Sequence, residues 1–100
     1  MKILAIEKEN EGINPDEFKK YAEEEAVTVW KLYKSDKIRE IYFRKDENCA
    51  VIVLECENIS EAKKILSRLP FVKNKLIHFD IIPLKPYPGF ERLFNDPGKS

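Results

Sequence analysis

The order in which two hydrophobic periods alternate along this 100-residue chain limits the folds open to it. Alternation of apolar and polar residues, typical of a half-exposed strand, covers four segments: Lys2–Lys8, Lys37–Lys45, Cys49–Glu57 and Lys75–Leu84. Helical spacing covers one stretch after the first segment and one after the third. The chain therefore predicts a β-α-β-β-α-β order: an α+β, ferredoxin-like fold with a four-stranded antiparallel sheet and two helices on one face.

Both helices have recognisable ends and stripes. Asn14 can cap free N–H groups and Pro15 suits the first helical position, so we expect a helix to begin there. Its buried stripe is expected at Phe18, Ala22, Ala26, Val29 and Tyr33. Ser60 is expected to cap the second helix and Pro70 to stop it. The stripe of that helix is Ala62, Ile65, Leu66 and Leu69.

The last strand and the segment after it suggest a domain followed by an arm. Pro83 cannot donate to a sheet ladder, which places the last strand at an edge, in agreement with the order 4-1-3-2 usual for this arrangement. We expect a ferredoxin-like domain over residues 1–85 and a C-terminal arm over residues 86–100. The arm is rich in proline and aromatic residues that need burial, so it docks on its own domain or on a partner, or covers a pocket.

The alternation also sorts the strand residues onto two faces. A hairpin at residues 45–48 that pairs Tyr42 with Val51 makes the helix side uniformly apolar, with Ile41, Phe43, Ile52, Leu54, Ile77, Phe79 and Ile81. The open side mixes aliphatic and polar residues: Leu76, Ile82, Val51, Val53, Glu40, Tyr42, Arg44, Glu55, His78 and Asp80. Exposed aliphatic patches of this kind usually meet a partner, which predicts a homodimer joined face to face.

Polar residues of the open face are the candidates for chemistry. His78 is the only histidine, and Asp80 on the same face could orient it as a general base; an edge or interface position is the alternative. Glu40 and Glu55 lie on neighbouring strands, where one carboxyl could raise the pKa of the other. Tyr42 and Arg44 could bind a small carboxylated substrate, or form an interface row. Trp30 and Tyr33 could roof a pocket between the first helix and the open face, although core packing suits Tyr33.

Composition excludes several classes of function. Eighteen basic and eighteen acidic residues leave no positive excess for nucleic acid. The longest aliphatic run is too short to cross a membrane, and the first strand begins at Lys2, which leaves no room for a signal peptide. Cys49 and Cys56 lie too far apart on one strand to form a disulfide, and no C-x-x-C spacing suggests a metal. We therefore expect a reduced, cytoplasmic protein, and the Lys- and Glu-rich composition hints at a thermophile.

Several segments resemble one family. These are Trp30-Lys31-Leu32-Tyr33, Ile38–Tyr42, Leu54-Glu55-Cys56, Glu61-Ala62, Leu69-Pro70 and above all Ile81–Phe90. Together they make residues 2–94 similar to the muconolactone isomerase-like family of dimeric α+β-barrel proteins. The resemblance implies the fold and the dimer. The enzyme that gives the family its name is an oligomer that moves a proton on a small lactone without a cofactor, and none of its catalytic residues is carried over here.

Two functions follow as hypotheses. The first is a cofactor-independent isomerase or lyase that acts by proton transfer on a small lactone or carboxylic acid, with His78, Asp80, Glu40 and Glu55 as catalytic candidates and Tyr42, Trp30 and Arg44 as substrate-binding candidates. The second is a non-catalytic dimeric module that binds a small ligand or acts as a scaffold. A haem protein with His78 as axial ligand is a more distant alternative. No metal or other cofactor is expected.

Overall fold

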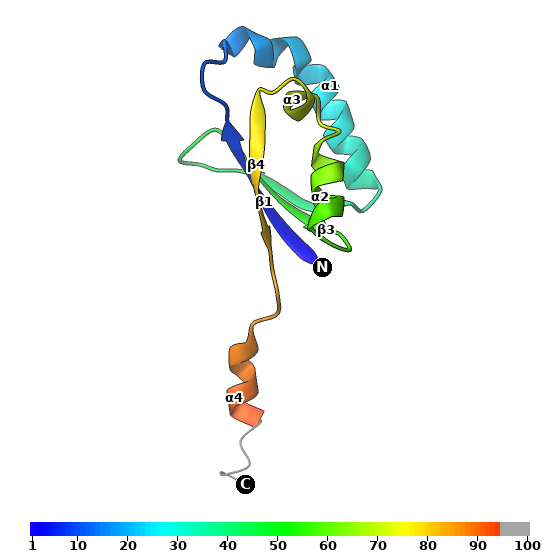
Figure 1. Cartoon of the computed structure of the whole chain (residues 1–100), viewed down its shortest axis with the longest axis vertical. Helices are drawn as coiled ribbons and strands as arrows, with labels where there is room; N and C mark the ends of the chain where they lie inside the picture. The colour runs from blue at the N-terminus through cyan, green and yellow to red at the C-terminus, as the bar shows by residue number, and fades with distance from the viewer. Residues whose placement is uncertain (95–100) are drawn as a thin grey trace.

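The computed structural model describes residues 1–94 and confirms the predicted order of elements (Figure 1). The strands are β1 (Lys2–Glu9), β2 (Ile38–Phe43), β3 (Ala50–Glu55) and β4 (Ile77–Pro83). The main helices are α1 (Pro15–Lys34) and α2 (Ile59–Leu66). Three short helical elements follow: α3 (Pro70–Lys73), the 3-10 turn η1 (Pro88–Phe90) and α4 (Glu91–Phe94).

The sheet has the predicted topology. Its order is β2-β3-β1-β4 and every neighbouring pair is antiparallel. Tyr42 pairs with Val51 as the hairpin length predicts, and Pro83 ends β4 at a sheet edge, where its missing N–H leaves no ladder bond unmade. The pairing of β2 with β3 is irregular at the beginning of β2, where the register shifts between Ile38 and Glu40. The ferredoxin-like α+β fold is therefore confirmed.

The core lies between one face of the sheet and the helices α1, α2 and α3, which cover that face (Figure 1). The largest fully buried side chains come from three strands and from α2 and the turn after it: Ile3, Ile38, Ile52, Leu54, Ile65 and Leu69. Burying a side chain of this size stabilises the fold by about 1.5–3 kcal/mol. The sheet residues predicted for the helix side pack into or against this core, as the period-2 pattern requires.

One of the two predicted helix caps is confirmed and the other is wrong. Asn14 caps α1 as predicted, with its Oδ1 accepting from the Asp16 N–H at 2.9 Å. Ser60, in contrast, is not the cap of α2. That cap is Asn58, which accepts from the Glu61 N–H at 2.8 Å, while the Glu61 carboxylate accepts from the Glu57 N–H at 2.8 Å. This reciprocal pairing satisfies two free N–H groups, an advantage that Ser60 does not have.

The apolar stripe of α1 was expected in the core, and it reaches the core only in part: Val29 packs against the core and Phe18 is half-buried. Leu32 is the only fully buried residue of the helix, whereas Ala22, Ala26 and Tyr33 are exposed. α1 has 20 residues and spans about 30 Å, while the six residues of β2 beneath it span about 20 Å. The helix is longer than the sheet edge it crosses, so much of the stripe borders an uncovered space.

The other sheet face carries no helix, as predicted. Among its aliphatic residues, Leu4, Ile6, Val51 and Val53 are half-buried and Ile82 is exposed. Leu76 was also expected there, but it is only 3% exposed. Its neighbour Lys75 has a left-handed backbone (φ 60°), which breaks the alternation just before β4 begins and lets Leu76 turn inward.

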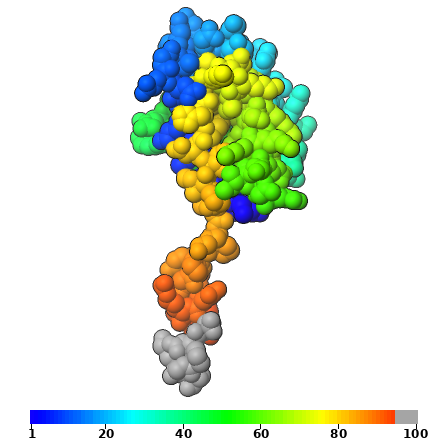
Figure 2. Space-filling model, viewed as in Figure 1, coloured from blue at the N-terminus to red at the C-terminus, as the bar shows by residue number. Residues whose placement is uncertain are grey.

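The segment after β4 extends away from the domain (Figure 2) and gives the molecule its 64 Å length against 29 and 22 Å in the other directions. It is not wholly irregular, because η1 and α4 form two short helical turns. Tyr87 and Phe90 pack edge to face at 5.0 Å, yet both stay about two thirds exposed. Between Tyr87 and Phe94 the arm therefore does not dock on its own domain; residues 95–100 of the predicted arm lie outside the described part of the chain.

Candidate functional site

A groove of about 570 Å³ runs between α1 and the edge of the sheet. One wall is the apolar stripe of α1: Ala22, Ala26, Val29, Trp30 and Tyr33. The facing wall consists of Ile41 and Phe43 of β2 with Phe71 of α3, and Glu25 of α1 is the one charged residue of the lining. The stripe that reaches the core only in part thus forms the surface of a concave, mostly apolar site, the usual character of a small-molecule pocket.

A smaller recess of about 90 Å³ lies beneath this groove. The two share Glu25, Val29, Ile41, Phe43 and Phe71, and the recess adds Glu7 of β1 to its lining. Glu7 alternates with Ile3 and Ala5 on the helix side of β1, so its carboxyl group enters the layer between sheet and helix. Two glutamates from different elements therefore meet at the inner end of one apolar groove.

Backbone groups hold both carboxyl groups in place. Glu7 Oε1 accepts from the Ala50 N–H, and Glu25 Oε1 accepts from the Phe71 N–H, each at 3.0 Å. These bonds tie β1 to β3 and α1 to α3. Neither carboxylate forms an ion pair with any residue between 1 and 94, so each keeps a second oxygen that a ligand could use.

Burial raises the pKa of both glutamates above the ordinary 4.5. Desolvation is the main cause for each, and the backbone N–H bonds act in the opposite direction. The negative charge of Glu7 raises the pKa of Glu25 further, while Glu9 does the same for Glu7. A carboxyl group with these properties holds a proton more readily at neutral pH, which general acid–base chemistry requires.

Sequence reasoning missed both glutamates. The available signal was a charged residue on an apolar face: Glu7 follows Ile3 and Ala5 on one side of β1, and Glu25 lies beside Ala22 and Ala26 on α1. Either residue alone reads as a surface glutamate. Their meeting depends on how α1 crosses the sheet, which the pattern along the chain does not contain.

Trp30 is the predicted binding residue that lies at the groove. Its ring stacks with that of Tyr33 at 6.1 Å and 28°, and it is 58% exposed. Both rings were expected to roof a pocket between the first helix and the open face. Trp30 lines only the groove on the helix side, whereas Tyr33 also borders a second pocket at the β2 edge together with Glu40 and Tyr42. Tyr33 is 46% exposed, so the expected core role for it is wrong.

Glu40 and Tyr42 lie together on the open face of β2. The Tyr42 hydroxyl donates to Glu40 Oε1 at 2.9 Å, and this bond raises the pKa of Tyr42. A tyrosine held by a carboxylate keeps its proton, so the pair can act as a hydrogen-bonding unit toward whatever covers this face. Both groups are exposed.

Glu55 is separated from this pair. Its carboxylate forms a 2.7 Å ion pair with the N-terminal ammonium of Met1, which lowers the pKa of Glu55. The sequence predicted that one of the two carboxyl groups, Glu40 or Glu55, would have a raised pKa; at Glu55 the pKa is lowered instead, because the positive charge of the chain terminus is the main influence on it.

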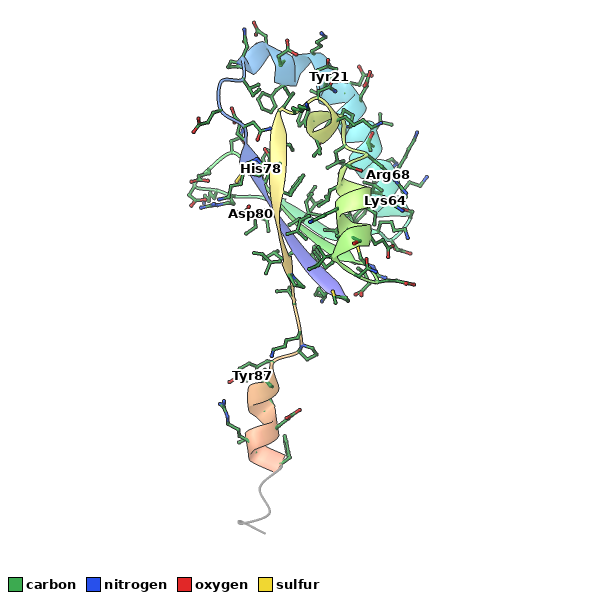
Figure 3. The ribbon with its side chains drawn as sticks, viewed as in Figure 1. Tyr21, Lys64, Arg68, His78, Asp80 and Tyr87 are labelled. Carbon is green, nitrogen blue, oxygen red and sulfur yellow. The ribbon has the colours of Figure 1, made fainter. Side chains whose placement is uncertain are left out.

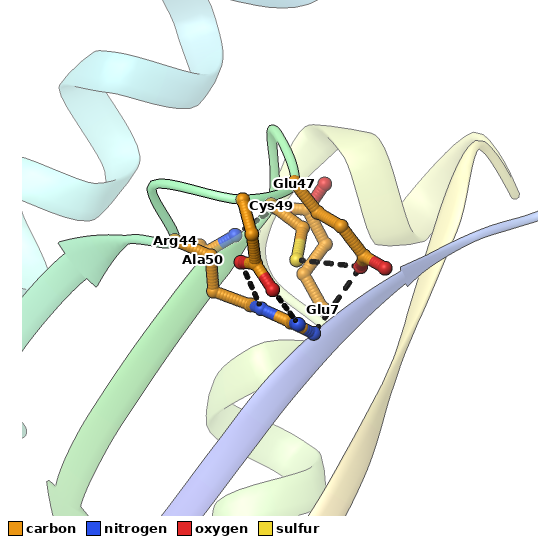
Figure 4. Close-up of polar contacts among 6 residues, drawn as sticks. Glu7, Arg44, Glu47, Cys49 and Ala50 are labelled. Carbon is orange, nitrogen blue, oxygen red and sulfur yellow. Dashed lines mark hydrogen bonds and ion pairs between the residues drawn. The ribbon is translucent and has the colours of Figure 1, made fainter.

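Arg44 belongs to the hairpin between β2 and β3 (Figure 4). Its guanidinium donates through two nitrogens to the Asp46 carboxylate and lies 3.2 Å from Glu47. The same hairpin places Glu7 against the Ala50 N–H. The Arg44 charge is compensated by its own turn, and the pKa of Asp46 is lowered by it.

His78 and Asp80 lie along β4, and both are exposed (Figure 3). The His78 Nδ1 lies 2.6 Å from Asn10 Oδ1, so the side chain at the end of β1, rather than Asp80, orients the ring within the described residues. Asp80 pairs across the sheet with Ile6. His78, Glu40, Tyr42, Glu55 and Arg44 thus form separate local contacts rather than one site. On the other side of the sheet Trp30 and Glu25 line the groove, and Glu7 lines the recess that shares Glu25 with it.

Comparisons with known proteins bear on the fold. The chain is similar to a solved structure of 5-chloro-2-hydroxyhydroquinone dehydrochlorinase (TftG) from Burkholderia phenoliruptrix AC1100, in complex with 2,5-dihydroxybenzoquinone. The match has a TM-score of 0.68 and 18% identity, and covers 85% of this chain and 94% of the other. No protein-family model and no curated protein matches the sequence. The match supports the ferredoxin-like α+β fold, and membership of the family stays a prediction.

Two further observations concern the environment of the chain. Within residues 1–94 no helix combines the length and the apolar character needed to cross a membrane. Cys49 and Cys56 are both buried free thiols.

Because both glutamates titrate above an ordinary carboxyl group, Glu25→Gln should change how stability depends on pH. A raised pKa in the folded state favours folding below pH 4.5, and that contribution is lost as the pH rises through the folded-state pKa. The variant keeps the acceptor for the Phe71 N–H but has no charge to bury. Urea unfolding should therefore show the variant gaining stability relative to the parent between pH 4 and pH 7; a difference that shrinks over this interval would contradict the assignment.

Proposed function

We propose that this chain is a small-molecule-binding α+β protein whose ligand lies in the groove beside α1, and that it is an isomerase or lyase acting by proton transfer, without a cofactor, on a small lactone or carboxylic acid. The observation that carries the proposal is Glu25, a half-buried carboxyl group at the inner end of an apolar groove. The sequence resemblance to the muconolactone isomerase-like family supports the reaction class. The structurally similar TftG, solved with 2,5-dihydroxybenzoquinone, supports small-molecule chemistry on this fold.

The reaction needs one general base that removes a proton from the substrate and can give it back. The Glu25 carboxylate takes a proton from a carbon next to a carbonyl group, and the electron pair moves onto the carbonyl oxygen. The same carboxyl group then gives the proton to another carbon, which completes an isomerisation, or a leaving group departs from the enolate, which completes an elimination. Glu7 lies behind it, and its charge helps to keep the pKa of Glu25 high enough for the return step.

The alternative is a non-catalytic dimeric module that binds a ligand or acts as a scaffold. Its support is the local pairing on the open face: Tyr42 is hydrogen-bonded to Glu40, the chain terminus forms an ion pair with Glu55, and Asn10 contacts His78. In this alternative His78, Asp80, Glu40, Glu55, Tyr42 and Arg44 have structural or interface roles. The proposal of open-face catalysis by the same residues remains testable in parallel.

Exchange of carbon-bound hydrogen with D₂O tests proton transfer without knowledge of the natural substrate. NMR should detect deuterium entering one or more members of a panel of unsaturated five-membered lactones when the protein is added. Glu25→Gln should slow this exchange by about a hundredfold or more, the usual contribution of a general base. Glu24→Gln, which changes an exposed carboxylate one position away on α1, should leave it unchanged.

The outcomes separate the hypotheses. Exchange that survives in Glu25→Gln but is lost in His78→Ala or Glu40→Gln would move the reaction to the open face. A protein that binds panel members without catalysing exchange supports the non-catalytic module.

We also propose that two copies associate through the open sheet face. Leu4, Ile6, Val51 and Val53 form an aliphatic centre on this face, and Ile82 extends it. The arm offers further apolar surface, since Tyr87, Phe90, Leu93 and Phe94 are between 64% and 84% exposed. A second copy is the partner that a face of this kind suits best, because two such faces are self-complementary about a two-fold axis.

Light scattering after gel filtration tests this assembly. The parent chain should have twice the 11.8 kDa mass, and Val53→Arg should give the monomer because it places a charge at the centre of the apolar contact. Val27→Arg makes the same substitution on the outer side of α1 and should leave the mass unchanged. A monomeric parent would contradict the proposed dimer.

A further inference from the structure

The groove has a lining whose charge is entirely negative. Glu7 and Glu25 are the charged residues among those that line the groove and its recess, and neither is paired with a cation in the described chain. Two basic residues lie outside this lining: the Lys34 ammonium is 6.0 Å from the Trp30 ring centroid, and Arg39 borders a separate pocket beyond Tyr33 and Ile41. An anion that enters this site therefore meets like charge.

The walls of the groove are largely aromatic. Trp30 and Tyr33 stack at 28° on one side, and Phe43 and Phe71 stand on the other. Phe71 is itself fixed, because its ring packs edge to face against Phe18 at 5.2 Å and its N–H is bonded to Glu25. Aromatic walls of this kind bind planar rings through stacking and edge contacts.

Glu25 offers a hydrogen-bond acceptor to a ligand in the groove. One oxygen of Glu25 is engaged by the Phe71 N–H, while its other oxygen has no partner within residues 1–94. A ligand hydroxyl could donate to that free oxygen. A ligand carboxylate could do so only if one of the two acids first took up a proton.

We infer that the groove binds an uncharged planar ring compound bearing a hydroxyl group, which donates to Glu25, and that it rejects ring compounds bearing a carboxylate. This inference rests on the proposed function and decides between the two substrate classes left open there, against the carboxylic acid. Like charges about 5 Å apart at an effective dielectric constant of about 20 account for at least a tenfold difference in affinity.

A matched pair of probes tests the inference, namely 4-iodophenol and 4-iodobenzoate. They share one ring and differ in charge at pH 7, and the iodine of either quenches tryptophan fluorescence on contact. Trp30 is the only tryptophan in the chain, so quenching reports binding at this groove. We expect 4-iodophenol to bind at least about tenfold more tightly than 4-iodobenzoate at pH 7.

Variants locate the source of this preference. Glu25→Gln should reduce it severalfold by strengthening the binding of 4-iodobenzoate, whereas Glu24→Gln should preserve it. Circular dichroism checks that both variants are folded. In the parent chain, 4-iodobenzoate should bind more tightly at pH 5 than at pH 7, because protonation of the acids at lower pH removes the negative charge that repels it. The groups that face Glu25 are the acidic Glu7 and apolar side chains, with Glu9 beyond Glu7 and Lys34 at the outer wall.

Each result is decisive. Equal or tighter binding of 4-iodobenzoate, or a preference that Glu25→Gln leaves intact, would overturn the inference while the ligand groove of the proposed function stands. Failure of both probes to quench Trp30 at millimolar concentration would contradict the ligand groove itself, and the inference with it.

Discussion

Two hydrogen bonds from backbone N–H groups to carboxylates fix the acidic residues of the groove beside α1. The Ala50 N–H reaches Glu7, and the Phe71 N–H reaches Glu25, so the acids sit between β1, β3, α1 and α3. A half-buried carboxylate loses hydration, and one hydrogen bond to each acid replaces it only in part. The remaining imbalance is what keeps both pKa values high. The groove, its charge and its proposed chemistry all depend on this arrangement.

The two faces of the sheet also differ in their proposed roles: the helix side carries the ligand groove, and the open side carries the surface for assembly. On the helix side, α1 is longer than the edge it crosses, so its stripe lines a groove and leaves Leu32 as its one fully buried residue. On the other side, aliphatic residues and locally paired polar groups form a surface suited to a second copy of the chain. Ligand binding and assembly need not compete for the same residues, and the arm, exposed in a single chain, is available to the assembly.

Much of the fold could be predicted from the sequence because the deciding signals are local. Alternation fixed which side of β2 and β3 is apolar, and the hairpin length fixed the pairing of Tyr42 with Val51. The prediction was wrong at two places. Asn58, rather than Ser60, caps α2, and Leu76, which follows the left-handed backbone of Lys75, is buried rather than exposed on the open face. The candidate site needed more than local signals. Glu7 and Glu25 are 18 positions apart, and only the path of α1 over the sheet brings them together, whereas the predicted acids Glu40 and Glu55 each found a closer partner.

The state of the two buried acids is the most direct test of this account. Carbon-13 NMR of the glutamate side-chain carboxyl carbons, followed from pH 3 to pH 9 and assigned with Glu7→Gln and Glu25→Gln, gives a midpoint for each group. The account predicts that both titrate clearly above 4.5, and that removing Glu7 lowers the midpoint of Glu25. Midpoints at or below 4.5 for both would show that these carboxylates are as well solvated as surface groups, and the account of the groove would be contradicted.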